Sequence, residues 1–251
     1  MRASFLRLCG TVSALMIGAL GTAFANPTAQ QNCDKSRVNA WKIYASCVEK
    51  QLANQAGGIS FSQSVAFAKC RHTYLKKWMI FQARPLLAGS TCIGDRYTDN
   101  GDGTVTDNLS DLVWETKTDD DSIHDQDNLY TWSTGAPYAG NGTLFTGFLG
   151  TLNSGPGFAD TNDWRQPTLA ELQTIELDFP CTGVGGGPTC RCPSSPCVDP
   201  ALGLTQSSSY WSVTTYVPNP AGAWNVYFGG GDPGLDDKTN QVYVRAVRGG
   251  F

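Results

Sequence analysis

Acidic side chains crowd one short stretch of the sequence. Five aspartates and one asparagine lie within ten positions: Asp119, Asp120, Asp121, Asp125, Asp127 and Asn128. Calcium is held in proteins by such hard oxygen ligands, so Asp119, Asp121, Asp125 and Asp127 are candidate metal ligands. A hydrated acidic loop is the simpler interpretation. We therefore expect no cofactor, with calcium as the alternative.

Aromatic side chains offer a second kind of chemistry, because sugars stack on flat apolar faces. The candidate ligand-binding residues are four tryptophans and the arginine beside one of them: Trp132, Trp164, Arg165, Trp211 and Trp224. Buried tryptophans would instead serve a core, and Arg165 could pair with Asp163 or with a core carbonyl. These five residues are therefore candidates only as a group.

Catalytic motifs are missing from the sequence, and we assign no catalytic residue. It contains no G-x-S-x-G elbow, H-E-x-x-H helix or phosphate-binding loop, and only two histidines. Carboxylate pairs suited to glycoside hydrolysis can be picked from any acidic domain, so they decide little. We expect a protein that is not an enzyme, with a secreted hydrolase as an alternative.

The first 25 residues have the features of a secretory signal peptide. Arg2 and Arg7 precede an apolar stretch over residues 8–20, and the small-residue triplet 23–25 provides a cleavage site before Asn26. Later segments are too polar to span a bilayer. We expect a secreted, periplasmic or outer-surface protein without a transmembrane segment after cleavage.

Cysteine usage also points to an oxidising compartment. Once Cys9 leaves with the signal peptide, eight cysteines remain: Cys33, Cys47, Cys70, Cys92, Cys181, Cys190, Cys192 and Cys197. An even number in an exported chain predicts disulfides, and the last four allow three pairings. A zinc site from Cys190, Cys192 and Cys197 fits poorly, because their spacing matches no common C-x-x-C pair and no histidine is near.

Charge divides the mature chain into two modules. Residues 26–89 hold nine Lys or Arg against two acidic residues, a local charge of +7, whereas residues 90–251 hold seven basic and twenty acidic residues, a local charge of −13. We expect a basic module over 26–91 and an acidic domain over 92–251. The basic module could bind a partner or pack on its acidic neighbour, and we expect no nucleic-acid partner.

Two amphipathic helices are predicted in the basic module. Apolar residues recur at helical spacing from Val38 to Leu52 and again from Phe61 to Met79, with a Gly57-Gly58 turn between them. In the resulting αα-hairpin Cys47 faces Cys70. Cys33 cannot reach Cys47, since fourteen helical residues rise about 21 Å. Cys33 therefore pairs most plausibly with Cys92.

Short strands and structured loops dominate the acidic domain. Asn-Gly and Asp-Gly steps flanked by strand formers predict a hairpin over residues 97–107, a stretch that also resembles a calcium loop but lacks its full ligand set. Short helices are expected over residues 145–152 and after a Thr168 and Glu171 capping box. Further strands are predicted over residues 210–216, 224–228 and 242–247.

Several motifs in the acidic domain carry a resemblance to a known family. They are D-N-G-D-G-T-V-T-D-N from Asp99, L-V-W from Leu112, His124-Asp125, Y-T-W from Tyr130, D-W-R-Q-P-T from Asp163 with Glu171-Leu172, Y-W-S from Tyr210, and Y-V-R-A-V-R from Tyr243. In this order they resemble the Lcl C-terminal domain family, which is named for a collagen-like bacterial surface adhesin. The resemblance covers nearly all of residues 92–251 and none of residues 26–91.

This resemblance implies a C-type-lectin-like fold, distantly similar to formylglycine-generating enzymes, and adhesion through glycans or sulfated polysaccharide. Gln166 stands where the family usually has an apolar residue. A domain at −13 repels sulfated polymers unless its arginines cluster. The triplets by which calcium lectins bind sugars are missing as well, since residues 224–226 are only Trp-Asn-Val.

The expected fold class is α+β: a C-type-lectin-like, β-rich domain with two short helices, preceded by a disulfide-linked αα-hairpin. The expected function is that of an exported or surface-associated binding or adhesion protein, which recognises a glycan or another envelope component without catalysis. A structural envelope protein without a glycan ligand is the main alternative.

Overall fold

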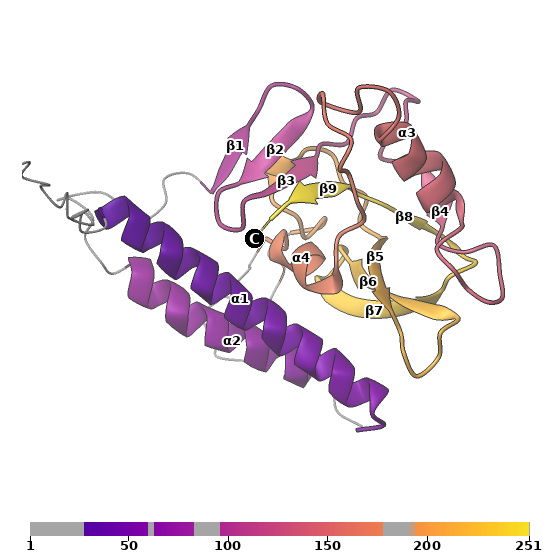
Figure 1. The fold of residues 1–251 in the computed structure, drawn as a ribbon. Helices are drawn as coiled ribbons and strands as arrows, with labels where there is room; N and C mark the ends of the chain where they lie inside the picture. The colour runs from indigo at the N-terminus through magenta and orange to yellow at the C-terminus, as the bar shows by residue number, and fades with distance from the viewer. Residues whose placement is uncertain (1–27, 60–62, 83–95, 178–191, 193, 251) are drawn as a thin grey trace, which may run out of the picture.

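The computed structural model describes residues 28–59, 63–82, 96–177, 192 and 194–250. The predicted signal peptide and three of the predicted disulfide cysteines, Cys92, Cys181 and Cys190, lie outside the described residues. The fold is α+β, with a helical hairpin followed by a β-rich region of two sheets (Figure 1). Within the described residues, no helix is long and apolar enough to cross a membrane.

The helical hairpin consists of α1 (Ala29–Ala56) and α2 (Gln63–Gln82). Thr28 begins α1 with a capping box, because its hydroxyl accepts from Gln31 N–H while the Gln31 side chain accepts from Thr28 N–H. The helix ends at Gly57, and Gly58 turns the chain with a φ of 80°. The predicted Cys47–Cys70 disulfide is confirmed, with Cα atoms 5.5 Å apart. Cys33 is buried and disulfide-bonded, but its predicted partner Cys92 is not described.

The first sheet has the strand order β1-β2-β3-β9 and is antiparallel throughout. Its strands are β1 (Tyr97–Asp99), β2 (Thr104–Asp107), β3 (Leu112–Glu115) and β9 (Val247–Gly249). The predicted hairpin is confirmed as β1 and β2, and Gly101 and Gly103 take the positive φ values that such a tight turn requires.

The second sheet has the order β4-β8-β5-β6-β7, and only the β5–β8 pair in it is parallel. Its strands are β4 (Leu129–Thr131), β5 (Ser209–Thr215), β6 (Gly222–Tyr227), β7 (Asp232–Asp237) and β8 (Gln241–Tyr243). The predictions over residues 210–216 and 224–228 correspond to β5 and β6.

One strand prediction is wrong. Residues 242–247 do not form one strand, because β8 ends at Tyr243 in the second sheet and β9 begins at Val247 in the first. Arg245 lies between them, fully buried, and donates hydrogen bonds to the carbonyls of Glu115, Leu202 and Leu204. The chain therefore crosses from sheet to sheet at a buried cation, although its apolar alternation suggests a continuous strand.

Both predicted short helices are present. The first is a π-helix, η1 (Leu144–Leu149), continued by α3 (Gly150–Leu152), and it ends before Asn153. The second is α4 (Leu169–Thr174), which begins with the expected capping box of Thr168 and Glu171. A short 3-10 helix, η2 (Pro200–Leu202), precedes β5.

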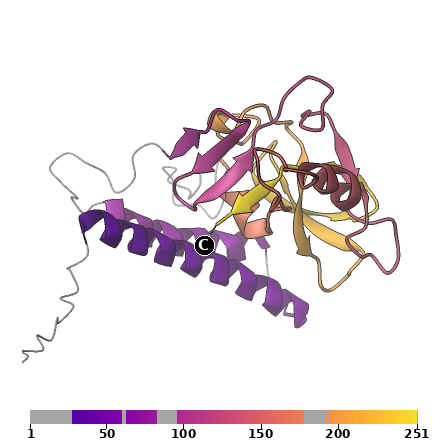
Figure 2. The same cartoon turned by 45° about the horizontal axis from the view of Figure 1, so that its top comes forward.

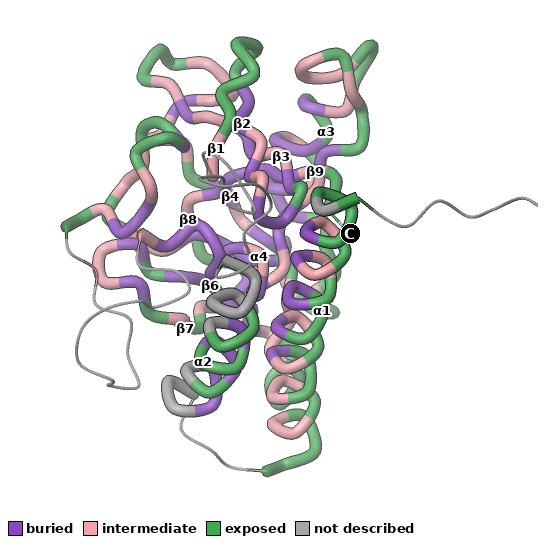
Figure 3. The backbone as a smooth tube through the Cα atoms, turned by 90° about the vertical axis from the view of Figure 1, so that its left-hand side faces the viewer, coloured by how far each residue is buried: buried purple, intermediate pink, exposed green. Residues whose placement is uncertain are grey.

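The hairpin packs against the acidic domain and shares its core. Figures 1 and 2 show α1 and α2 side by side along one flank of the β-rich region, and Figure 3 shows buried positions recurring along α1. Phe67 of α2 meets Trp224 of β6 edge to face at 5.8 Å. Arg37 binds Asp111 at 2.7 Å, and Arg71 binds Glu176 at 3.1 Å. The positive charge of the hairpin is thus partly neutralised by carboxylates of the domain.

Candidate functional site

The four candidate tryptophans are buried. Trp132, Trp164 and Trp211 belong to one core cluster, whereas Trp224 belongs to the core that the hairpin shares. The indole nitrogen of Trp132 donates to Ser212 O at 3.2 Å, that of Trp211 to Tyr130 O at 3.0 Å, and that of Trp164 to Phe158 O at 2.9 Å. The structure therefore does not gather these rings on one open face.

Trp164 and Arg165 nevertheless border a groove. The Asn153 side chain fixes this segment to the end of α3, since it accepts from Trp164 N–H and donates to Trp164 O, both at 2.8 Å. Arg165 is bound to Val247 of β9 through paired backbone hydrogen bonds of 2.9 Å. These contacts place Arg165 between α4 and the end of β9.

The Arg165 side chain forms a bidentate ion pair with Glu171, with N–O distances of 2.8 and 2.7 Å. The expected partners were Asp163 or a core carbonyl. The predicted pair of Arg165 with Asp163 is wrong. Arg165 binds Glu171 instead, because the capping box holds the Glu171 carboxylate at the start of α4, facing Arg165. Arg165 also donates to Gly249 O at 3.1 Å. The hydrogen bonds that Arg165 donates to Glu171 raise the pKa of Arg165, so the guanidinium stays charged.

The groove has a volume of about 680 Å³. It lies between η1 with α3, the segment before α4, and β5, and is lined by Phe145, Leu149, Gly150, Asn153, Trp164, Arg165, Gln166, Thr168, Glu171 and Val213. Apolar side chains supply most of its wall, and the Arg165 and Glu171 pair supplies charge at its border. Ligand pockets commonly combine these features, an apolar lining with a few placed polar groups.

Gln166 gives the groove an unusual polar group. The residue is buried, and its Nε2 donates to the carbonyl of Trp211 in β5. Its Oε1 is buried and accepts no hydrogen bond. An unmade hydrogen bond on a buried acceptor costs about 1–3 kcal/mol, so a donor brought to this oxygen by a bound molecule would remove that cost.

Comparison with protein families identifies the β-rich region. A family model described as the Lcl C-terminal domain matches residues 103–248, which is more than half of the chain. The chain belongs to this family. No curated protein and no solved structure gives a significant match. The groove, Arg165 and Gln166 all lie within the matched Lcl C-terminal domain.

The acidic loop of the Lcl C-terminal domain brings together three of its four candidate metal ligands. Asp119, Asp125 and Asp127 each offer a carboxylate oxygen, and these atoms lie within 4.8 Å of one another, but Asp121 is not part of the group. Asp125 is buried, and its two oxygens accept from the backbone N–H groups of Asp120, Asp121 and Asp127 at 2.7–2.8 Å. These hydrogen bonds lower the pKa of Asp125, with the bond from Asp127 the largest cause. Asp125 therefore organises its own loop.

A buried ionic cluster beneath this loop was missed from the sequence. Glu115 is fully buried, and its Oε1 is contacted by Lys117 Nζ at 2.9 Å and His124 Nδ1 at 2.8 Å, while its Oε2 accepts from Ala246 N–H at 2.9 Å. Burial alone would raise the pKa of Glu115, but Lys117, His124 and the Ala246 N–H together lower it. Nothing in the spacing of these residues distinguishes them from exposed strand-end charges.

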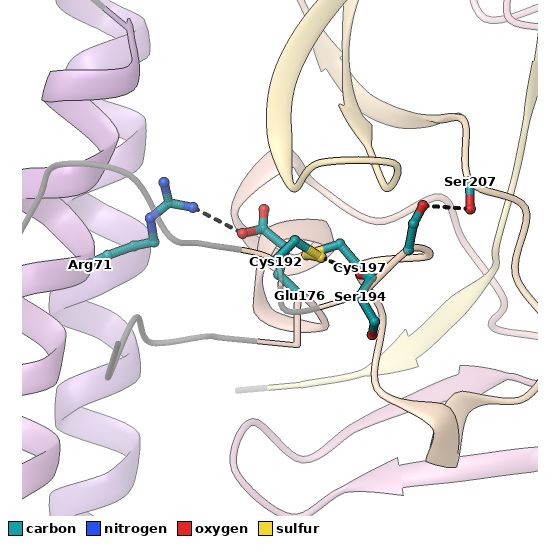
Figure 4. The surroundings of a disulfide bond; sticks show 7 residues. Arg71, Glu176, Cys192, Ser194, Cys197 and Ser207 are labelled. Carbon is teal, nitrogen blue, oxygen red and sulfur yellow. Dashed lines mark hydrogen bonds and ion pairs between the residues drawn. A yellow bond between two sulfur atoms is a disulfide. The ribbon is translucent and has the colours of Figure 1, made fainter. Parts of the chain in front are cut away.

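The pairing of two cysteines near the hairpin is now defined. Cys192 bonds to Cys197, which decides one of the pairings left open by the sequence. Zinc binding by Cys190, Cys192 and Cys197 is excluded, because two of the three sulfurs are bonded to each other. Figure 4 shows this disulfide beside the Arg71 and Glu176 ion pair. The bridge therefore lies where α2 meets the Lcl C-terminal domain.

Proposed function

We propose that this protein is an exported, surface-associated binding protein that holds a glycan or another envelope component in the groove beside Arg165. The observation that carries the proposal is the groove itself, in which an apolar wall meets a fixed guanidinium and an unpaired buried acceptor. Membership of the Lcl C-terminal domain family and two disulfides among the described cysteines support a surface location. The structure has two sheets, and we propose that this architecture is a C-type-lectin-like fold.

Binding in this groove is proposed to be non-catalytic. Glu171, the carboxylate of the groove, accepts from Thr168 N–H and from both terminal nitrogens of Arg165. A general base needs a carboxylate that can take a proton from the reacting group. Because Glu171 is held in an ion pair beside a permanent cation, it is poorly suited to that task.

Binding is also proposed to be independent of calcium. Asp125 lies at the centre of the candidate metal group, and backbone donors already engage both of its oxygens. A cation would have to compete with the hydrogen bonds that shape the loop. Glycan retention should therefore be unchanged when EDTA is added.

A glycan array with two matched variants tests the proposal. Val213 is an exposed groove residue on β5, so Val213→Trp should fill the groove without entering the core. Val217→Trp adds the same ring at an exposed residue that does not line the groove. Specific retention by the wild type and by Val217→Trp, with loss in Val213→Trp, supports the proposal. No specific retention by the wild type favours the structural envelope protein, and retention by Val213→Trp moves the site elsewhere.

A further inference from the structure

We propose that the groove recognises an acetamido group, the N-acetyl substituent of an amino sugar. This inference rests on the proposed function and names the ligand class for the same groove. An acetamido group combines one N–H donor, one carbonyl acceptor and one methyl group within a few ångströms. The groove offers a matching partner for each of the three.

The partner for the N–H is Gln166 Oε1. The amide is fixed in orientation, because Nε2 donates to the carbonyl of Trp211 in β5. The remaining oxygen is a buried acceptor without a hydrogen bond, on a residue that lines the groove. A buried polar atom left unpaired is costly, and a ligand donor removes that cost.

The partner for the carbonyl is the guanidinium of Arg165. An arginine carries five N–H donors, and three are engaged by the two bonds to Glu171 and the bond to Gly249. The side chain is 40% exposed, so it can be reached from solvent. The ion pair with Glu171 also fixes its position, which lowers the entropic cost of binding.

The partner for the methyl group is the apolar wall. Phe145 and Leu149 come from η1, and Trp164 closes the groove close to Arg165. Phe145 is only partly buried, so its ring remains open to a small apolar group. The methyl group would gain contact there without displacing a polar partner.

The charge of the domain disfavours an anionic ligand. Residues 90–251 carry a local charge of −13, which repels carboxylated and sulfated sugars. The acetamido group is neutral, and its dipole matches the acceptor and cation that Gln166 and Arg165 present.

The experiment compares two neutral hexasaccharides with the same β-1,4 backbone, the N-acetylglucosamine hexamer and the glucose hexamer, by titration calorimetry on the full mature protein. We expect the N-acetylated hexamer to bind about tenfold more tightly, the value of one good hydrogen bond. Saturation-transfer NMR on the wild type should place the strongest signal on the acetyl methyl protons. Equal affinity for both hexamers overturns the acetamido assignment while the proposed glycan-binding function stands. Binding of neither hexamer, together with no specific retention on the glycan array, overturns both.

Gln166→Leu tests the acceptor, with Gln241→Leu as a matched control at an exposed residue of β8. Gln166→Leu should remove the preference for the N-acetylated hexamer, and Gln241→Leu should keep it. A preference that survives Gln166→Leu overturns the role of Gln166. Should this variant not fold, the wild-type comparison of the two hexamers still decides the assignment. Tighter binding of an acetyl-lysine peptide than of the hexamer would overturn the choice of an amino sugar.

Discussion

The acidic loop and the groove beside Arg165 contain the same kinds of polar side chain but use them differently. In the loop, the oxygens of Asp125 accept from three backbone N–H groups, and Asp120 accepts from Ser122 N–H and from the Thr118 hydroxyl. In the groove, Gln166 keeps a buried oxygen without a partner, and Arg165 retains donors beyond its pair with Glu171.

A concentration of ligand-type residues therefore does not by itself make a binding site. Five aspartates and one asparagine within ten positions stand out in the sequence, yet the central carboxylate, Asp125, holds together its own loop. A single glutamine draws no attention in the sequence, yet it lines the groove and keeps a buried oxygen without a hydrogen-bond partner. Our proposal therefore follows the unsatisfied buried group, because native folds leave few such groups without a partner.

The largest expected effect comes from removing the buried charge beneath the loop. Glu115→Gln leaves Lys117 buried without its counter-charge, and the free energy of unfolding should fall by about 3 kcal/mol. Urea denaturation measures this change. Glu49→Gln, at an exposed residue of α1, serves as the control and should change little. A fall of the same size in both variants would mean that Glu115 does not anchor the loop.

A smaller but clear loss is expected from Asp125→Ala, because three backbone N–H groups lose their acceptor. The Tm should fall by about 5 °C. Asp119→Ala should leave the Tm unchanged, since Asp119 is exposed. If added calcium raised the Tm of the wild type and Asp119→Ala abolished that rise, the loop would be a metal site, contrary to our comparison.

Acidification should weaken the loop gradually. The folded-state pKa values of Glu115 and Asp125 lie below their ordinary values of 4.5 and 3.8, so both carboxylates stabilise the fold above those values and lose this contribution as pH falls through the lowered pKa values. The Tm should therefore decrease from pH 5 toward pH 2, and less steeply in Glu115→Gln. A Tm independent of pH over this range would contradict the assigned hydrogen bonds.

The smallest expected effect on stability is at the groove. Gln166→Leu removes the unpaired oxygen together with the hydrogen bond to Trp211, and these two changes oppose each other. The free energy of unfolding should change by less than about 1 kcal/mol, as measured by urea denaturation. A large loss would show that Gln166 serves the core, in the way that Asp125 serves its loop.

Local patterns in the sequence determined much of the fold. Apolar spacing predicted the two long helices and the segment from Phe145 to Leu152, and the Thr168 and Glu171 capping box marked the start of α4. The Cys47–Cys70 bridge followed from helical rise and one reversal of the chain. These features depend on neighbours within a few turns, whose geometry is set by the backbone itself.

The candidate site was less predictable. Trp164 and Arg165 were singled out and do border the groove, but Arg165 pairs with Glu171, six residues on, because the chain turns into α4 between them. Gln166 was noted only as a departure from the family pattern. Whether its oxygen is satisfied depends on the position of Trp211, which is 45 residues away in the sequence.

The helices, the β-hairpin, one disulfide and the family could be predicted from the sequence, because each depends on local periodicity or on short motifs. Three features became visible only in the folded molecule: the chain changes sheets at Arg245, Glu115 is buried beside Lys117, and the basic hairpin packs on the acidic domain. Burial and hydrogen-bond satisfaction are properties of the packed molecule, since both depend on residues that are distant along the chain.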